Sequence, residues 1–267
     1  MVEQLYHTPD IYRIYVPLPD NPLKYLNCYV LVSDGETLII DTGFNRPECK
    51  QALFDGLDEL QVDFAHTKLF LTHLHGDHSG LTEELTARGV PVFMNAIDYD
   101  YLCQELASGG WQAMEQIFLS EGFPREEIEK QKKGNQARLY SPHHPFPASK
   151  VSNNNLLTVG GITLRCIHTP GHTPGHTCLY IEEKEILFSG DHILFDITPN
   201  ISVWRNVPFS LADYLESLQK IKCLKVSHTF PGHREFHGDI QDRINALTLH
   251  HHARLKEILD AIDQHPD

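Results

Sequence analysis

The sequence predicts an α/β fold built in layers, and three observations lead to this prediction. The chain has 267 residues, which is long for an average domain but ordinary for one large α/β domain. Hydrophobic residues make up 41% of it and charged residues 22%, so a sizeable core can be buried, which argues against disorder and coiled coil. Short runs rich in Val, Ile, Leu and Tyr alternate with segments of helical period.

The first part of the chain predicts several short strands before a motif-rich loop. Asp34-Gly35, between two extended runs, is a strong hairpin signal. Pro47 stands near the start of a segment of helical period, where its fixed backbone angle is tolerated. In order, the predicted elements are strands over residues 11–16, 27–32 and 37–41, a helix over 47–60, a strand over 68–71, a helix over 81–87 and a strand over 90–94.

The second part begins with a helical and aromatic segment from residue 96 to about residue 133. The proline-rich stretch 141–147 then interrupts regular structure. Gly160-Gly161 and the stretch 182–184 read as turns between strands. The elements predicted after this stretch are strands over 156–159, 162–168, 177–181 and 186–189, a helix over 208–222, a strand over 225–230 and a long helix over 241–263.

Charge and targeting signals narrow the partners and the compartment. Lys plus Arg total 22 against 36 Asp plus Glu, a net charge of −14, which disfavours a nucleic-acid partner. No basic start with an apolar run and no stretch near 18 apolar residues is present, so neither a secretory signal nor a membrane span is expected. Six widely spaced cysteines read as reduced, buried thiols. We therefore expect a cytoplasmic protein with a small-molecule substrate.

Histidine is the unusual entry in the composition, with 18 residues, and the question is where they cluster. Four potential ligands fall within six residues directly after the predicted strand 68–71: His73, His75, Asp77 and His78. Residues two apart in an extended segment project to the same side, so His73 and His75 can share one ion. Asp77 and His78 lie close enough to supply a second ion. The alternative, a solvated polar loop, explains this density poorly.

Further His and Asp residues follow other predicted strands, each beside small Gly and Pro turns that let the backbone bend sharply. Strand ends are where sites are commonly built, so these side chains are expected to converge on one cleft. The segments are Thr169-Pro170-Gly171-His172-Thr173-Pro174-Gly175-His176, Gly190-Asp191-His192 and Pro231-Gly232-His233.

Together with Asp41-Thr42-Gly43, these motifs occur in an order and with a spacing that resemble the metallo-β-lactamase superfamily, over roughly residues 10 to 240. The resemblance implies a four-layer αββα sandwich with a two-metal site at one edge. It implies a catalytic domain over residues 1–240, including a helical insertion over about 96–150 that covers the site. The segment 241–267 is then a C-terminal helix, which in relatives often leads into a small helical domain.

The resemblance also implies a ligand set. The first metal takes His73, His75 and His172, and the second takes Asp77, His78 and His233. Asp191 bridges the two ions, and Asp77 and Asp191 are the carboxylates expected to act in catalysis. The members of the set are His73, His75, Asp77, His78, His172, Asp191 and His233.

Other polar residues in the motifs receive supporting roles. His172 is preferred to His176 as a ligand because it carries the Thr-Pro-Gly-His-Thr context of the family. His168, His176 and His192 are expected to be structural or to support the ligands. Asp41 is expected to brace the ligand loop by hydrogen bonds, as metal sites generally require.

Two divalent ions can share a hydroxide and lower the pKa of its parent water towards 7. Zinc is the first candidate, with iron or manganese open, because imidazole and carboxylate ligands suit all three. The sequence thus predicts a metal-dependent hydrolase in which a bridging hydroxide cleaves a thioester or ester, similar to glyoxalase II (hydroxyacylglutathione hydrolase). The basic glutathione-binding residues of that branch find no match here, which argues against glutathione itself.

Several other activities on the same scaffold stay open. Asp191 stands where the commonest zinc β-lactamases carry Cys, which argues against antibiotic hydrolysis. The lactonases of the superfamily place a Tyr shortly after the bridging Asp, where this chain has His192-Ile193-Leu194-Phe195. A lactonase, a phosphodiesterase and a mononuclear iron enzyme resembling the persulfide dioxygenases are the alternatives, and a homo-oligomer is compatible with the sequence.

The pocket walls are expected from two regions. One is the aromatic insertion with the loop 141–147, and the other is the segment 197–200 after the bridging Asp. The aromatic residues of the insertion could equally pack it onto the body of the protein. They are Tyr99, Tyr101, Trp111, Phe118 and Phe123. The triplet His250-His251-His252 reads as a solvated helix face.

Overall fold

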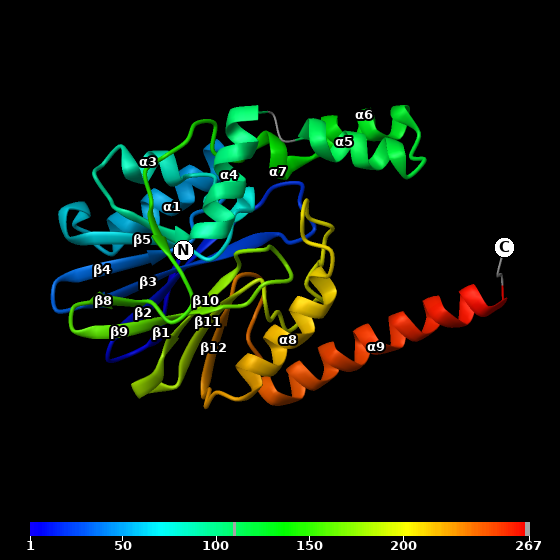
Figure 1. Ribbon diagram of the computed structural model, residues 1–267. Coiled ribbons are helices and arrows are strands. Elements are labelled where there is room, and N and C mark those ends of the chain that lie inside the picture. Colours follow the sequence, from blue (N-terminus) through cyan, green and yellow to red (C-terminus); the bar gives the residue numbers. More distant parts are fainter. Residues whose placement is uncertain (109–110, 265–267) are drawn as a thin grey trace.

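The structure, a computed structural model, describes residues 1–108 and 111–264 and contains two mixed β-sheets that lie face to face (Figure 1). The larger sheet has the order β1-β2-β3-β4-β5-β6-β7, antiparallel from β1 to β4 and parallel from β4 to β7. Its strands are β1 (Val2–Tyr6), β2 (Asp10–Pro17), β3 (Tyr25–Ser33), β4 (Glu36–Ile40), β5 (Thr67–Leu71), β6 (Val92–Asn95) and β7 (Ser149–Val151).

The smaller sheet has the order β12-β11-β10-β9-β8, and only its β11–β12 pair is parallel. Two-residue turns with positive φ angles close the β3–β4 hairpin at Asp34-Gly35 and the β8–β9 hairpin at Gly160-Gly161, as the sequence predicts. The strands of this sheet are β8 (Leu156–Val159), β9 (Ile162–His168), β10 (Thr177–Ile181), β11 (Ile186–Gly190) and β12 (His228–Pro231).

Alternation along each strand divides the core into three layers of side chains. On β5, Phe70 faces the other sheet, whereas Leu69 and Leu71 face the outer helices. On β10, Leu179 lies between the sheets and Cys178 packs against the helices of the opposite side. Because both faces of both sheets are covered, the central strands are buried on both faces and mainly apolar, as β11 with its five buried residues shows.

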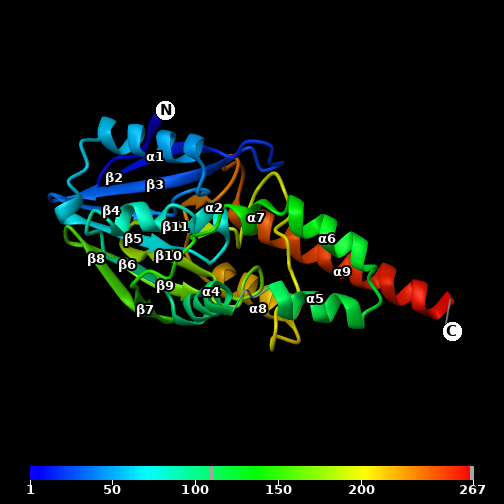
Figure 2. The same cartoon turned by 90° about the horizontal axis from the view of Figure 1, so that it is seen from above.

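Helices cover the two outer faces, which completes the four-layer αββα sandwich (Figures 1 and 2). The outer face of the larger sheet packs against α1 (Pro47–Glu59), α3 (Thr82–Thr86) and α4 (Ala96–Ser108). The outer face of the smaller sheet packs against α8 (Ser210–Lys222) and the beginning of α9 (Ile240–Gln264). The predicted fold class is therefore confirmed.

Two helical parts project from this body (Figure 2). The first contains α5 (Trp111–Ser120), α6 (Arg125–Gly134) and α7 (Gln136–Leu139), which with α4 make up the predicted insertion. The second is the distal part of α9, where residues 252–264 are all exposed. Residues 265–267 of the predicted terminal helix, and the side chain of Trp111, lie outside the described part of the chain. None of the helices in that part combines the length and apolar character needed to cross a bilayer.

The structure differs from the sequence prediction at a few elements. β1 and β7 were not predicted, because one is a polar edge strand and the other has three residues beside a proline-rich stretch. The final strand begins at His228 rather than at residue 225. The motif predicted as a loop contains a one-turn helix, α2 (Gly76–Ser79), that carries Asp77 and His78.

Candidate metal centre

The seven predicted ligands meet at one edge of the sandwich, where strands from both sheets end. His73 and His75 follow β5, while Asp77 and His78 lie in α2. The other three side chains come from the loops at the ends of the strands of the smaller sheet: His172 after β9, Asp191 after β11 and His233 after β12. The structure therefore brings all seven predicted residues together, and their role as metal ligands stays a prediction.

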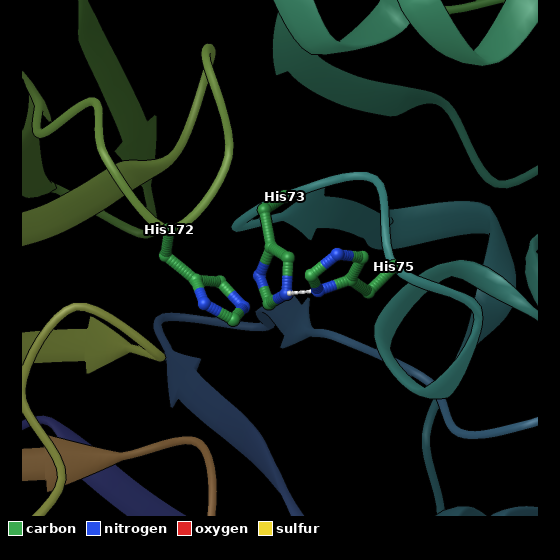
Figure 3. Close-up of side chains that lie close together, drawn as sticks. All are labelled: His73, His75 and His172. Carbon is green, nitrogen blue, oxygen red and sulfur yellow. Dashed lines mark hydrogen bonds between the residues drawn. The ribbon is translucent and has the colours of Figure 1, made fainter. Parts of the chain in front are cut away.

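The first group contains His73, His75 and His172, whose rings point toward one another (Figure 3). Nε2 of His73 lies 3.1 Å from Nδ1 of His75. Two nitrogens on one zinc ion, each about 2.0–2.1 Å from it in tetrahedral geometry, are roughly 3.3 Å apart. His73 and His75 therefore have the spacing of two ligands on a single ion, and the ligand atoms of all three residues lie within 4.8 Å of one another.

The second group contains Asp77, His78 and His233. Nε2 of His78 lies 3.2 Å from Nε2 of His233, and Nε2 of His233 lies 3.3 Å from a carboxylate oxygen of Asp77. All three side chains are buried. This group offers two imidazole nitrogens and one carboxylate to a second ion.

Asp191 lies between the two groups. Its Oδ2 is 3.5 Å from Nε2 of His172 in the first group and 3.5 Å from Nε2 of His233 in the second. Its Oδ1 is buried without a hydrogen-bond partner, and so is Nε2 of His172. Buried polar atoms without partners are unusual, and here they face the centre of the cluster. These orphaned donor atoms fit a group that contains bound cations.

The second ring nitrogen of each buried ligand is held by the protein. Nδ1 of His172 donates to the carbonyl of Asn200 at 2.6 Å, and Nδ1 of His233 donates to the carbonyl of Tyr25 at 2.8 Å. Such bonds fix the tautomer so that Nε2 carries the lone pair. The unprotonated Nε2 atoms of these two rings therefore point into the cluster.

Asp41 braces the ligand loop, as the sequence analysis expects. It accepts hydrogen bonds from the amide and hydroxyl of Thr72, both at 2.8 Å, and contacts Nδ1 of His78 at 2.8 Å. The Thr72 hydroxyl also lies 3.0 Å from Nδ1 of His73. One buried carboxylate thus orients a ring in each ligand group.

The histidines of the first group are held neutral, which is the form that binds metal. Burial, with a contribution from neighbouring imidazoles, lowers the pKa of His73 well below its usual value. Burial and the proximity of His172 lower the pKa of His75 to about 3.

In the second group the pKa values of the histidines are raised rather than lowered, because carboxylates surround them. Burial alone would lower the pKa of His78, but Asp41, Asp191 and Asp77 outweigh it and raise that pKa well above its usual value. Burial would likewise raise the pKa of Asp77, but His78 and His233 bring it down to about 2. The carboxylates are therefore ionised, as ligands must be.

Among the motif histidines outside the ligand set, His168 and His176 have hydrogen-bond partners, whereas both ring nitrogens of His192 are buried without one. Nδ1 of His176 contacts the Thr169 hydroxyl at 2.8 Å, and its Nε2 accepts from the amide of Asp191 at 3.1 Å. Both ring nitrogens of His176 are therefore engaged, which favours His172 over His176 as the candidate ligand. His168 contacts the carbonyl of Pro174, and the ring of His192 packs against His176 and Tyr214.

A cavity of about 1450 Å³ opens over the cluster and contains His75, Asp77, His172 and Asp191 in its lining. The predicted wall 197–200 contributes to it, and the insertion contributes from α4 to α7. Tyr101 and Phe118 line the cavity, whereas Tyr99 packs on Phe146 and Phe123 packs on Phe118, so the aromatic residues serve both expected purposes.

Trp204, in the loop after β11, contacts two of the candidate ligands and was not predicted from the sequence. The Trp204 ring stacks on His75 with centroids 5.9 Å apart, and its indole N–H donates to the carbonyl of His172 at 3.2 Å. Tyr101 of α4 packs edge-on against Trp204 and donates its hydroxyl to the carbonyl of Arg205. No local signal marks Trp204, because its role depends on contacts with distant segments.

The fold and the seven-residue cluster define the class of the protein. The sequence profile of the metallo-β-lactamase superfamily matches residues 22–233, and the chain belongs to this superfamily. The family implies divalent metal ions, and the His and Asp groups described above could hold them.

Curated relatives of the chain include enzymes named as thioesterases. One is an atrochrysone carboxyl ACP thioesterase of Cryptosporiopsis sp., 26% identical over 98% of this chain and 65% of its own length. A relative whose name gives no substrate is the beta-lactamase-like protein 2 homolog of Caenorhabditis elegans, 26% identical over 92% of this chain and 68% of its own length. The chain spans slightly less than two thirds of the first of these relatives.

Solved structures also resemble the chain. A metallo-beta-lactamase family protein of Thermus thermophilus aligns with a TM-score of 0.83 and 31% identity over 95% of this chain and 83% of that protein. A beta-lactamase domain protein of Burkholderia ambifaria aligns with a TM-score of 0.78 and 26% identity over 97% of this chain and 79% of that protein.

Proposed function

We propose that this chain is a metal-dependent hydrolase that uses two divalent ions to cleave a thioester or an ester of a small acyl substrate. The observation that carries the proposal is the convergence of two ligand groups and Asp191 at the floor of one cavity. Zinc is the first candidate for both ions, because its usual ligands are imidazole nitrogens and carboxylate oxygens.

By the resemblance, His73, His75 and His172 would hold the first ion and Asp77, His78 and His233 would hold the second. Asp191 lies between the two groups and would serve both. Such a pair of ions supplies a nucleophile from water at neutral pH and polarises the oxygen of the scissile carbonyl. The carboxylates Asp77 and Asp191 face the reacting centre. Asp41, His176 and the carbonyl of Asn200 keep the ligands in place through the hydrogen bonds described above.

The cavity lining favours an acyl group over a highly charged polymer. Apolar side chains from α4 and α5 and from the loop after β11 face the space above the cluster. They include Leu102, Leu106, Phe118, Ile201, Val203 and Trp204. A substrate whose acyl part lies along this wall would place its carbonyl at the floor of the cavity.

The thioesterase names of several relatives favour a thioester over a lactone, a β-lactam or a phosphodiester. Those names refer to an acyl group carried by an acyl carrier protein, so we extend the proposal to acyl thioesters rather than to the glutathione thioesters of glyoxalase II alone. A cytoplasmic location, the lack of a nucleic-acid or membrane partner and a homo-oligomeric state stay predictions from the sequence.

The test is a hydrolysis screen with the protein reconstituted in turn with zinc, iron and manganese. Acyl thioesters are expected to be cleaved fastest, with lactones, β-lactams and phosphodiesters as the competing classes. Asp191→Ala is expected to abolish turnover and to weaken the binding of both ions. Unaffected hydrolysis in this variant would contradict the role of Asp191, and one iron per chain with oxygen uptake would favour the dioxygenase alternative.

A further inference from the structure

Asp98 is a buried carboxylate that the proposed chemistry does not use. It lies in the first turn of α4 and is fully buried. Its Oδ2 accepts from the amide of Leu74 at 3.0 Å and from the hydroxyl of Thr173 at 2.6 Å, and its Oδ1 accepts from the amide of Gly175. Within residues 1–108 and 111–264, no Lys, Arg or His forms an ion pair with it. Burial raises the pKa of this carboxyl to about 7, and the three hydrogen bonds that it accepts oppose that shift.

The three donors belong to the two segments that carry the first ligand group. Leu74 lies between His73 and His75, and Thr173 directly follows His172. These segments come from different sheets, one after β5 and the other after β9. Asp98 therefore joins two loops that have no strand pairing with each other.

The backbone of the second loop is shaped for this contact. A Cβ atom at position 175 would lie 2.4 Å from the amide nitrogen of Asp98, so only glycine allows the two segments to approach this closely. Next to this contact, the side-chain amide of Asn95 donates to the hydroxyl of Thr177 at 3.0 Å, and the amide of Thr177 donates to the carbonyl of Thr72 at 2.9 Å.

The sequence Thr-Pro-Gly-His occurs twice in succession, over residues 169–172 and 173–176, and we call the pair the doublet. The contacts of Asp98 account for its second half, which the ligand set leaves unexplained. The first half supplies the ligand His172. In the second half, the Thr173 hydroxyl and the Gly175 amide bind Asp98, and His176 binds the amide of Asp191. The doublet thus combines one ligand with the donors that hold its loop.

We propose that Asp98 is a positioning residue for the first ligand group, fixing the loop of His73 and His75 against the loop of His172. The second group does not depend on it, because Asp41 holds His78 and the carbonyl of Tyr25 holds His233. This inference rests on the proposed metal centre. It also gives the insertion a direct contact with the ligand loops, since Asp98 is on the same helix as the cavity residues Tyr101 and Leu102.

The experiment compares zinc affinity, measured by competition with a chromophoric chelator, in two backgrounds. His233→Ala disables the second group and leaves the first, whereas His75→Ala disables the first and leaves the second. Asp98→Asn is introduced into each background. The matched control is Asp100→Asn on the same helix, where the carboxylate is half exposed and pairs with Lys150 on the surface.

In the His233→Ala background, Asp98→Asn is expected to weaken zinc binding by roughly 10- to 100-fold, the usual effect of removing a partner that orients ligands. The amide that replaces the carboxylate presents an NH2 group to one of the three donors, so that bond is lost. In the His75→Ala background the same substitution is expected to leave zinc affinity unchanged, and Asp100→Asn is expected to have no effect in either.

Equal weakening in both backgrounds would overturn the proposal, because it would indicate a general loss of structure. Unchanged affinity in both would overturn it as well. If neither background binds zinc before Asp98 is changed, the proposed metal centre itself fails, and the role of Asp98 fails with it. Should Asp98→Asn not fold, Thr173→Val removes only one of the three donors, and a smaller weakening confined to the first group is then expected.

Discussion

Two histidines in one loop, four residues apart, differ in what surrounds their ring nitrogens. Nε2 of His172 has no hydrogen-bond partner and faces Asp191, while both nitrogens of His176 are occupied by Thr169 and by the amide of Asp191. A nitrogen that already accepts a hydrogen bond cannot also bind a metal. The surroundings therefore distinguish a ligand from a supporting residue where the sequence shows a repeated motif.

We therefore expect His172→Ala to lose the ion of the first group and His176→Ala to retain at least part of the metal content. The second substitution removes the acceptor of the Asp191 amide, so some weakening of binding is expected through that ligand. Metal content per chain after dialysis, measured by elemental analysis, checks this. Equal loss in both variants would show that His176 is a ligand.

The cysteines give a second prediction at this scale. Burial raises the pKa of the Cys49 thiol to about 11 and that of Cys166 and Cys178 to about 12. Since the thiolate is the reactive form and appears only as the pH approaches the pKa, these three thiols are expected to resist iodoacetamide at pH 8 in the folded protein. Exposed Cys223 is expected to react. Mass spectrometry of the alkylated protein measures which thiols have reacted. Urea-unfolded protein is the control, in which every thiol is expected to react. Rapid labelling of Cys166 in the folded protein would contradict the prediction.

The convergence of the seven candidate ligand residues could be predicted from the sequence because their signal is local. His73, His75, Asp77 and His78 are adjacent in sequence, and Gly or Pro turns mark the other positions. Asp98 and Trp204 could not be predicted, since an acidic residue in the first turn of a helix is ordinary and a lone tryptophan in a loop has many uses. Their roles arise only when α4 and the loop after β11 fold over the ligand loops.

At the scale of elements, β3 holds the loop that carries His233. The side-chain amide of Asn27 donates to the carbonyls of Pro231 and Arg234 at 2.9 and 2.7 Å, and the hydroxyl of Tyr29 donates to the carbonyl of Pro231 at 2.7 Å. Tyr29 and Asn27 are buried. This strand of the larger sheet therefore fixes a ligand loop of the smaller one.

Asn27→Ala is expected to lower the free energy of unfolding by about 1–3 kcal/mol, because the half-buried carbonyl of Arg234 loses its side-chain donor and the carbonyl of Pro231 loses one of two. Tyr29→Phe is expected to cost less, about 1 kcal/mol, since Asn27 still donates to Pro231. Urea unfolding of the metal-free variants checks the order, and a larger loss from Tyr29→Phe would contradict it.

Elements with strong periodicity or clear turns were predictable, and those fixed by distant contacts were not. The strands 156–159, 162–168 and 177–181 match β8, β9 and β10, because Gly160-Gly161 and the following turns delimit them. The helical pattern from residue 96 to about residue 133 includes α4, α5 and α6, and periodicity alone did not place their ends. β7 has three residues and pairs with β6, a contact that no local pattern reveals.

For the whole molecule, the sandwich arrangement came from the resemblance and not from periodicity, which predicts strands and helices but not how sheets stack. The order of the strands matters for function because it brings the ends of β5, β9, β11 and β12 to one edge. The ligands therefore come from both sheets, and bound ions would connect the two halves of the fold.

This connection predicts that removing metal destabilises the entire domain. A ligand that binds only the folded state stabilises it by about 4 kcal/mol when its free concentration is 1,000 times its Kd. For a chain of this size, that amount corresponds to a rise in Tm of roughly 8 °C for each ion. Scanning calorimetry with excess zinc and with a chelator measures the shift. His66→Ala, which changes an exposed histidine outside the site, is expected to keep the full shift. Asp191→Ala is expected to lose most of it, because Asp191 lies between the two proposed ligand groups, 3.5 Å from His172 and 3.5 Å from His233. An unchanged Tm on chelation of the parent protein would show that no ion connects the two sheets.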